Sequence, residues 1–98
     1  MSTPSQVASW RQTLTELGPR QREVLDTLTA AYPRGMSAWQ LADKLGRLVH
    51  AVRPRIVELR ERGLVRAIGE RFEPLTQRHE AVWTVIGPPE PSGQLRLI

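Results

Sequence analysis

Apolar residues in the first third of the chain recur at helical spacing in two segments. The two apolar stripes are formed by Val7, Trp10, Leu14 and Leu17, and by Val24, Leu25, Leu28 and Tyr32. The residues 3–6, Thr-Pro-Ser-Gln, fit a capping box with proline at the first helical position. Gly18-Pro19 ends the first helix and can start the second. The pattern therefore predicts a helix that ends near Leu17 and another over residues 19–31, with both stripes buried.

A third and a fourth helix are expected to follow, joined by a short turn. Ser37-Ala38-Trp39-Gln40 is again a capping box, and Gly46 suits a left-handed C-cap, which predicts a helix over residues 38–45. The fourth helix is expected over residues 50–62. Two helices separated by three or four residues that include a glycine are typical of a helix-turn-helix.

The fourth helix carries the apolar stripe Val52, Ile56 and Leu59. Pro54 lies near its start. Proline has no backbone N–H, and only in the first helical turn do the N–H groups lack a partner within the helix. We therefore expect regular helix to begin late, near Ala51 or Val52.

The hydrophobic period then changes from about 3.6 toward 2. Residues 64–68 and residues 81–86 are expected to form two strands, the second rich in β-branched and aromatic side chains. About twelve residues, 69–80, separate them. We expect this segment to be a long basic loop that carries Arg71 and Arg78.

Charge is distributed unevenly along the 98 residues. The net charge is +4, and thirteen of the fourteen cationic residues are arginine. The segment from Lys44 to Arg78 holds nine Lys/Arg and four Glu, a net of +5, whereas the remainder has a net charge of −1. A basic segment suggests an acidic partner such as nucleic acid, although arginine-rich composition also produces basic surfaces without one.

The residue inventory argues against catalysis and against a metal or other cofactor. The two histidines, His50 and His79, lie far apart without helix-spaced carboxylates, and the chain has no cysteine. No phosphate-binding glycine loop or nucleophile motif is present. The chain has no apolar run of membrane-spanning length, and its first residues do not resemble a signal peptide. We expect a cytoplasmic protein that is not an enzyme.

Three segments resemble winged-helix proteins: SAWQLADKLG (37–46), VHAVRPRIVELRERGLV (49–65) and AVWTV (81–85). They are similar to small bacterial and phage winged-helix proteins, including the DNA-binding domains of the MarR and ArsR types. The resemblance implies an α+β winged helix-turn-helix of three to four helices plus a two-stranded β-hairpin wing. The chain lacks the long extra C-terminal helices with which MarR-type regulators dimerise. The fold alone does not determine function, because it also serves protein-binding modules.

A helical projection of the fourth helix suggests which residues face a DNA groove. With Val52 facing inward, the arginines lie on the flanks, while Glu58 and Glu61 lie outward near the C-terminal end. Only the first turns are therefore expected to approach base edges. The N-terminus of the third helix, at Ser37, offers N–H groups to a phosphate. The residues expected to contact DNA are Ser37, Arg47, His50, Arg53, Arg55, Arg71 and Arg78.

Two functions are consistent with this pattern. The first is sequence-specific binding of double-stranded DNA, as expected of a transcriptional regulator. The second is a protein-interaction module, such as a phage-encoded inhibitor of a host protein, and the outward Glu58 and Glu61 motivate it.

The chain is expected to have three parts. Residues 1–18 form a helix that packs on the core or makes a homodimer contact through Trp10 and Leu14. Residues 19–86 form the winged helix-turn-helix domain. Residues 87–98, which begin Gly-Pro-Pro-Glu-Pro-Ser-Gly, are expected to be a flexible tail.

Overall fold

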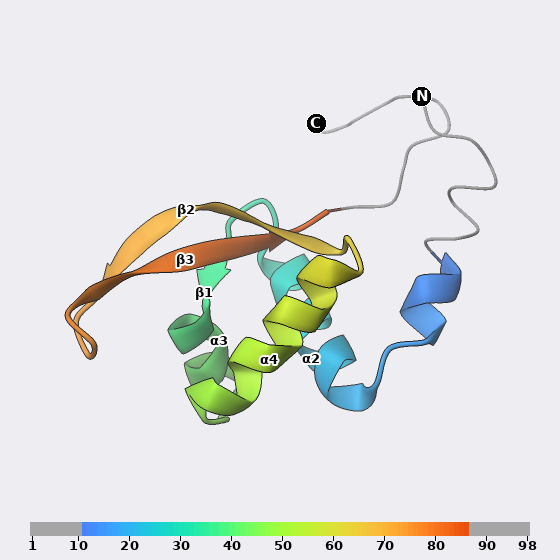
Figure 1. Ribbon diagram of the computed structural model, residues 1–98, viewed down its shortest axis with the longest axis horizontal. Coiled ribbons are helices and arrows are strands. Elements are labelled where there is room, and N and C mark those ends of the chain that lie inside the picture. Colours follow the sequence, from blue (N-terminus) through green and yellow to red (C-terminus); the bar gives the residue numbers. More distant parts are fainter. Residues whose placement is uncertain (1–10, 87–98) are drawn as a thin grey trace.

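A computed structural model describes residues 11–86 and shows a winged helix-turn-helix arrangement (Figure 1). Residues 11–15 are helical. The elements that follow are α2 (Pro19–Ala31), β1 (Met36–Ser37), α3 (Ala38–Leu45), α4 (Val49–Glu61), β2 (Val65–Glu73) and β3 (Arg78–Val85). Helices α2, α3 and α4 gather on one side of the β2–β3 hairpin. The predicted α+β fold class is thereby confirmed.

Helix α2 has the predicted bounds. The backbone N–H of Gly18 donates to Oε1 of Gln21 at 3.0 Å, and proline occupies the first helical position. Val24, Leu25 and Leu28 are buried as expected. The prediction that Tyr32 is buried is wrong, because this side chain is 55% exposed. Tyr32 adopts φ −51° and ψ 138°, so it has already left the helical path and the helical period no longer places it.

Helix α3 is defined by the local signals predicted from the sequence. Oγ of Ser37 accepts a hydrogen bond from the backbone N–H of Gln40 at 3.2 Å, and Oε1 of Gln40 accepts one from the Ser37 N–H at 2.9 Å. Gly46 ends the helix in the left-handed region, with φ 66°. Reciprocal capping at one end and a left-handed glycine at the other thus confirm the bounds.

Helix α4 starts earlier than predicted. The N–H groups of Ala51 and Val52 donate to the carbonyl oxygen of Leu48 at 3.0 and 3.3 Å, so the first turn begins at Val49. The expected late start is wrong, and Pro54 lies inside the helix. Its ring is on the exposed side, where water can solvate the carbonyl that lacks a helical N–H partner.

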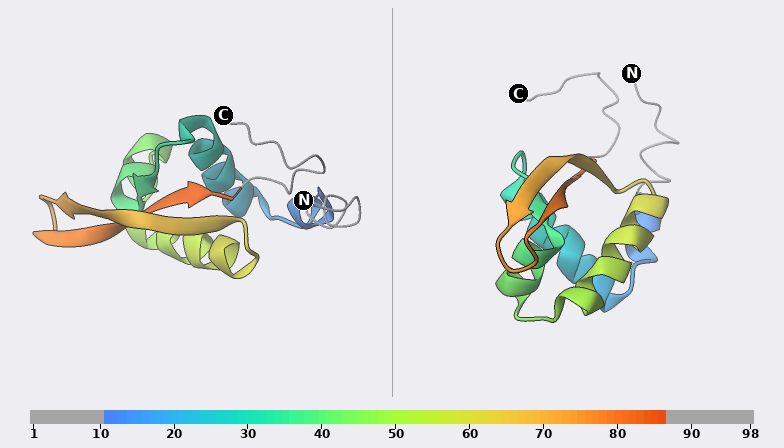
Figure 2. Two further views of the ribbon diagram at one scale, coloured as in Figure 1. Left: turned by 90° about the horizontal axis from the view of Figure 1, so that it is seen from above. Right: turned by 60° about the vertical axis from the view of Figure 1, so that its left-hand side comes forward.

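The predicted long loop between the strands is wrong. Strands β2 and β3 continue through most of residues 69–80 and leave only a four-residue turn, 74–77. The pairing extends to Glu73 opposite Arg78, and the rings of Phe72 and His79 meet edge to face across the ladder with centroids 5.7 Å apart. The wing is therefore a long hairpin, and Figure 2 shows its tip reaching beyond the helices.

A third strand, β1, was not predicted. It has only two residues, and it pairs antiparallel with β3 so that Met36 lies opposite Trp83. The sheet order is β1-β3-β2, with a bulge between Ala67 and Gly69 of β2. A two-residue strand has no detectable alternation, so only its non-local partner reveals it.

The hydrophobic core lies between the helices and the base of the hairpin. Its buried members are Val24, Leu25, Leu28, Ala38, Leu41, Ala42, Val52, Ile56, Leu59, Leu64 and Val65. Leu14 and Leu17 pack against this cluster, and Nη1 of Arg62 lies 3.4 Å from Oε1 of Glu16. The part of the N-terminal segment that the structure describes therefore packs on its own domain. Val7 and Trp10, the capping box at residues 3–6, and the expected tail lie outside the described residues.

Candidate nucleic-acid interface

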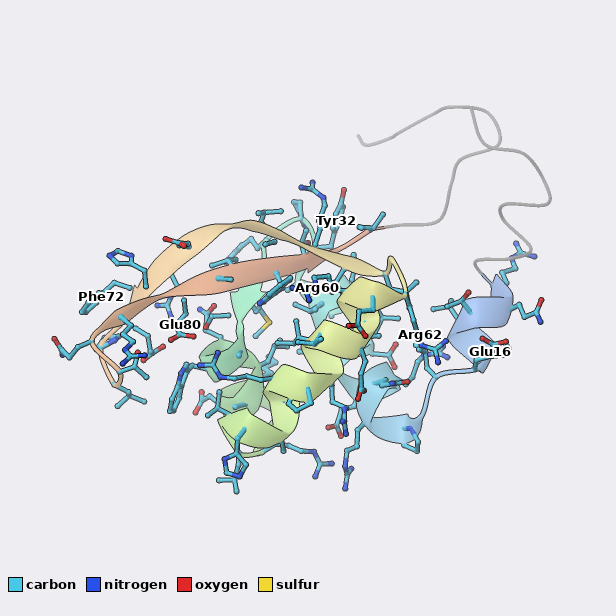
Figure 3. The ribbon with its side chains drawn as sticks, in the orientation of Figure 1. Glu16, Tyr32, Arg60, Arg62, Phe72 and Glu80 are labelled. Carbon is cyan, nitrogen blue, oxygen red and sulfur yellow. The ribbon has the colours of Figure 1, made fainter. Side chains whose placement is uncertain are left out.

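Helix α4 has one buried and one exposed face, as the helical projection predicted. Val52, Ile56 and Leu59 are almost fully buried, whereas His50 and Arg53 near the start of the helix are exposed. The wing runs beside this end of α4 (Figure 3). The first turns of α4, the preceding turn and the outer half of the hairpin thus form one continuous candidate surface.

Ser37 has a structural role at the edge of this surface. Its side chain is 0% exposed and its hydroxyl is engaged in the cap of α3. Its backbone N–H is bonded to Gln40 as well. Ser37 therefore positions α3 and does not present its hydroxyl to solvent.

Arg47 is held by a carboxylate of α2. Its Nε donates to Oε2 of Glu23 at 2.7 Å, and its Nη2 donates to Oε1 at 2.9 Å. This two-point contact lowers the pKa of Glu23, chiefly through the hydrogen bond from Arg47, and raises the pKa of Arg47 for the same reason. Arg47 therefore clamps the α3–α4 turn to α2, and two of its donors are already occupied.

Arg55 is also engaged within the domain. Its Nη2 donates to Oε2 of Glu58 at 2.8 Å, and Nε2 of Gln21 donates to Oε1 of the same carboxylate at 2.8 Å. These contacts lower the pKa of Glu58, first through the Gln21 hydrogen bond and then through Arg55. Glu58 consequently faces α2, and of the two acids expected to lie outward only Glu61 is exposed.

Arg53 makes a single contact across to the wing. Its Nη2 donates to Oε1 of Glu80 at 2.8 Å. The Arg53 side chain is 48% exposed, whereas that of Glu80 is 12% exposed, and Figure 3 shows Glu80 pointing from the hairpin toward α4. Within residues 11–86 no other polar partner is found for the Arg53 guanidinium, so Nε and Nη1 remain available for a ligand.

The two arginines that were expected in the wing loop, Arg71 and Arg78, lie on paired strands. Nη1 of Arg71 is 3.5 Å from Oε1 of Glu73, a weak contact at the limit of hydrogen-bonding distance. Arg78 starts β3, is exposed, and has no ion pair with another residue of the described part of the chain. Of these two arginines, Arg78 therefore has the guanidinium group that is freer to bind a phosphate.

A shallow hollow of about 600 Å³ lies between α3, the start of α4 and the tip of the wing. Trp39 lines it together with Leu48 and Leu75. Leu48 is 66% exposed and Leu75 is 76% exposed. Sequence reasoning missed this apolar surface, because Leu75 is brought close to Trp39 and Leu48 only by the pairing of β2 with β3, which places the wing tip there.

Within residues 11–86 no group of three or more His, Asp or Glu side chains is arranged to hold a metal ion. In the same part of the chain, no helix has both the length and the apolar composition required to cross a bilayer.

The lowered pKa values of Glu23 and Glu58 predict how stability responds to acid. A carboxyl group with a folded-state pKa below its unfolded value stabilises the fold above the unfolded pKa, and this contribution is lost as pH falls through the folded pKa. We expect the denaturation midpoint in urea to decrease as the pH is lowered below about 4.3, the ordinary glutamate value. Glu23→Gln and Glu58→Gln should each make this decrease shallower.

Glu70→Gln is the matched control for this acid titration. Glu70 is exposed and has no ion-pair partner in the described part of the chain. Its substitution removes a carboxylate without breaking an ion pair, so it is the reference for the two ion-paired glutamates. Identical profiles for all three variants and the wild type would show that the two ion-paired carboxylates do not contribute to acid sensitivity.

Comparison of the chain with protein-family models, with curated proteins and with solved structures gives no match. The classification therefore rests on architecture alone. The helix order, the helix-turn-helix formed by α3 and α4, and the three-stranded antiparallel sheet define a small α+β domain with winged-helix topology.

Proposed function

We propose that this domain binds double-stranded DNA in a sequence-specific manner and acts as a transcriptional regulator. The observation that carries the proposal is the exposed start of α4, where His50 and Arg53 are exposed and Arg53 contacts Glu80 of the long hairpin. A helix presented in this way by a helix-turn-helix fits the major groove, with its N-terminal residues toward base edges. The wing would lie against the neighbouring backbone, where Arg78 meets a phosphate.

The ion pairs narrow the set of residues proposed to contact DNA. Arg47 and Arg55 are engaged with carboxylates that also tie α2 to the helix-turn-helix, so we assign them to positioning. His50, Arg53 and Arg78 remain as contacts, with Arg71 at the side of the wing. The exposed Glu61 near the end of α4 would repel phosphates, so the helix has to leave the groove there.

Binding to a fluorescent duplex at graded salt concentration tests this proposal. Each phosphate neutralised by a cation contributes about −0.9 to the slope of log K against log salt concentration. With three or four contacts, we expect a slope of about −3 to −4 and weak but measurable binding at low salt. Absence of duplex binding at low salt would exclude the proposed function.

The apolar hollow beside α3 favours a second candidate, a protein-interaction module. Leu48 and Leu75 expose large apolar side chains at the surface that DNA would occupy, and the nearby Asp43 adds negative charge. An inhibitor of a host protein would use this hollow for an apolar anchor of its partner. Recovery of one stoichiometric partner after nuclease treatment, lost on Leu48→Asp, would support this function.

A further inference from the structure

The contact between Arg53 and Glu80 places a wing carboxylate beside an exposed cation near the start of α4. The two residues are 27 positions apart in the sequence, and the pairing arises only because the hairpin folds over α4. Glu80 is largely buried, and Arg53 is the only cation within ion-pair distance of it in residues 11–86. A ligand that bound Arg53 and broke its contact with Glu80 would leave this carboxylate without a partner, which is unfavourable for a largely buried charge.

The Glu80 carboxylate is expected to repel a phosphate bound by Arg53 more strongly than it repels the edge of a base. A phosphate bound by Arg53 carries a full negative charge close to that of Glu80, and the two repel each other. The N7 and O6 acceptors of guanine carry only partial charges, so repulsion from the carboxylate is smaller. Because Glu80 occupies only Nη2, the remaining Arg53 donors can still bind such an edge.

We propose that Glu80 is a specificity-determining residue, which weakens non-specific phosphate binding by Arg53 and thereby favours its contact with bases. This inference rests on the proposed DNA-binding function and adds a role for an acidic residue of the wing. It predicts that neutralising Glu80 makes the domain a tighter but less selective DNA binder.

The test compares Glu80→Gln with Glu70→Gln on a random-sequence duplex of fixed length. Both substitutions remove one negative charge from the same hairpin, but Glu70 is exposed and has no ion-pair partner in the described residues. We expect E80Q to tighten non-specific binding by about five- to tenfold and E70Q by about twofold or less. Glutamine retains an oxygen acceptor for Arg53, so the fold should persist, and a thermal unfolding curve checks this.

A double-mutant cycle assigns the effect to Arg53. In the Arg53→Ala background, E80Q should improve binding no more than E70Q does. Selection from random duplexes should also give weaker enrichment with E80Q than with the wild type.

Failure of the role proposed for Glu80 can be distinguished from failure of the proposed DNA-binding function. If the wild type binds duplex DNA but E80Q binds no more tightly than E70Q, or keeps its full advantage without Arg53, the role of Glu80 is wrong. If neither the wild type nor any variant binds duplex DNA at low salt, the proposed function is itself overturned.

Discussion

Gly35→Ala should destabilise this domain more than any surface substitution. A Cβ atom on Gly35 would lie 2.5 Å from Cγ1 of Val82, 2.7 Å from the carbonyl oxygen of Trp83 and 2.9 Å from Cδ1 of Ile68. The Trp83 carbonyl belongs to the strand that pairs with β1, so it cannot move away without disturbing the sheet. Forcing extra volume into a packed site costs about 1–3 kcal/mol, and we expect the upper end of this range.

The melting temperature is the direct measurement of this effect. For a domain of this size, a loss of about 3 kcal/mol lowers the melting temperature by roughly 12–24 °C. Gly18→Ala is the control, because a Cβ atom there meets nothing within 4 Å and its φ of −73° suits any residue. It should stay within about 1 kcal/mol of the wild type. Equal stability of the two variants would show that Gly35 is not closely packed against β3.

The second large effect is expected on DNA affinity, from Arg53→Ala. This substitution removes the cation with the most available donors at the start of α4. The loss of an arginine contact to a base or a phosphate costs about 1–3 kcal/mol, which weakens binding roughly 5- to 150-fold. A fluorescence titration with a duplex at constant salt measures this change.

Two controls separate this loss from general effects of charge and stability. Arg22→Ala removes the same charge from α2, where Arg22 is paired with Asp26, and should change affinity little. Arg53→Ala combined with Glu80→Gln removes the carboxylate that would otherwise be left unpaired. If Arg22→Ala weakens binding as much as Arg53→Ala, the start of α4 is not the contact surface.

The helices were predictable because their boundaries are encoded by neighbouring residues. Ser37 and Gln40 cap α3 reciprocally, and Gly46 ends it with a positive φ, so each signal lies within a few positions of the boundary. Pro54 misled the prediction for α4, since this proline lies inside the helix at an exposed position.

The wing was less predictable because strand pairing is non-local. Arg71 and Arg78 lie in a charged segment without clear alternation, and their strands extend because β2 and β3 support each other, as the Phe72–His79 contact shows. The order of polar and apolar residues along one strand does not reveal which residues of the other strand lie opposite. The predicted loop and the observed hairpin therefore place the same two arginines in different environments.

The ion pairs of the candidate site could likewise be predicted only where the two residues are close in sequence. The Arg55–Glu58 pair has the i,i+3 spacing that a helical sequence reveals. In contrast, Arg47 and Glu23 are 24 positions apart in the sequence, and Arg53 and Glu80 are 27 positions apart. Sequence reasoning placed these arginines on the candidate surface, but the carboxylates that restrain them become apparent only in three dimensions.

Selection of bound sequences from random duplex DNA tests the central claim most directly. If the start of α4 contacts base edges, the wild-type domain should enrich a short motif, and Arg53→Ala should lose or relax part of it. Enrichment of a palindrome would additionally show that two copies bind together. Recovery of duplexes without any shared motif, or no recovery at low salt, would contradict sequence-specific DNA binding by this domain.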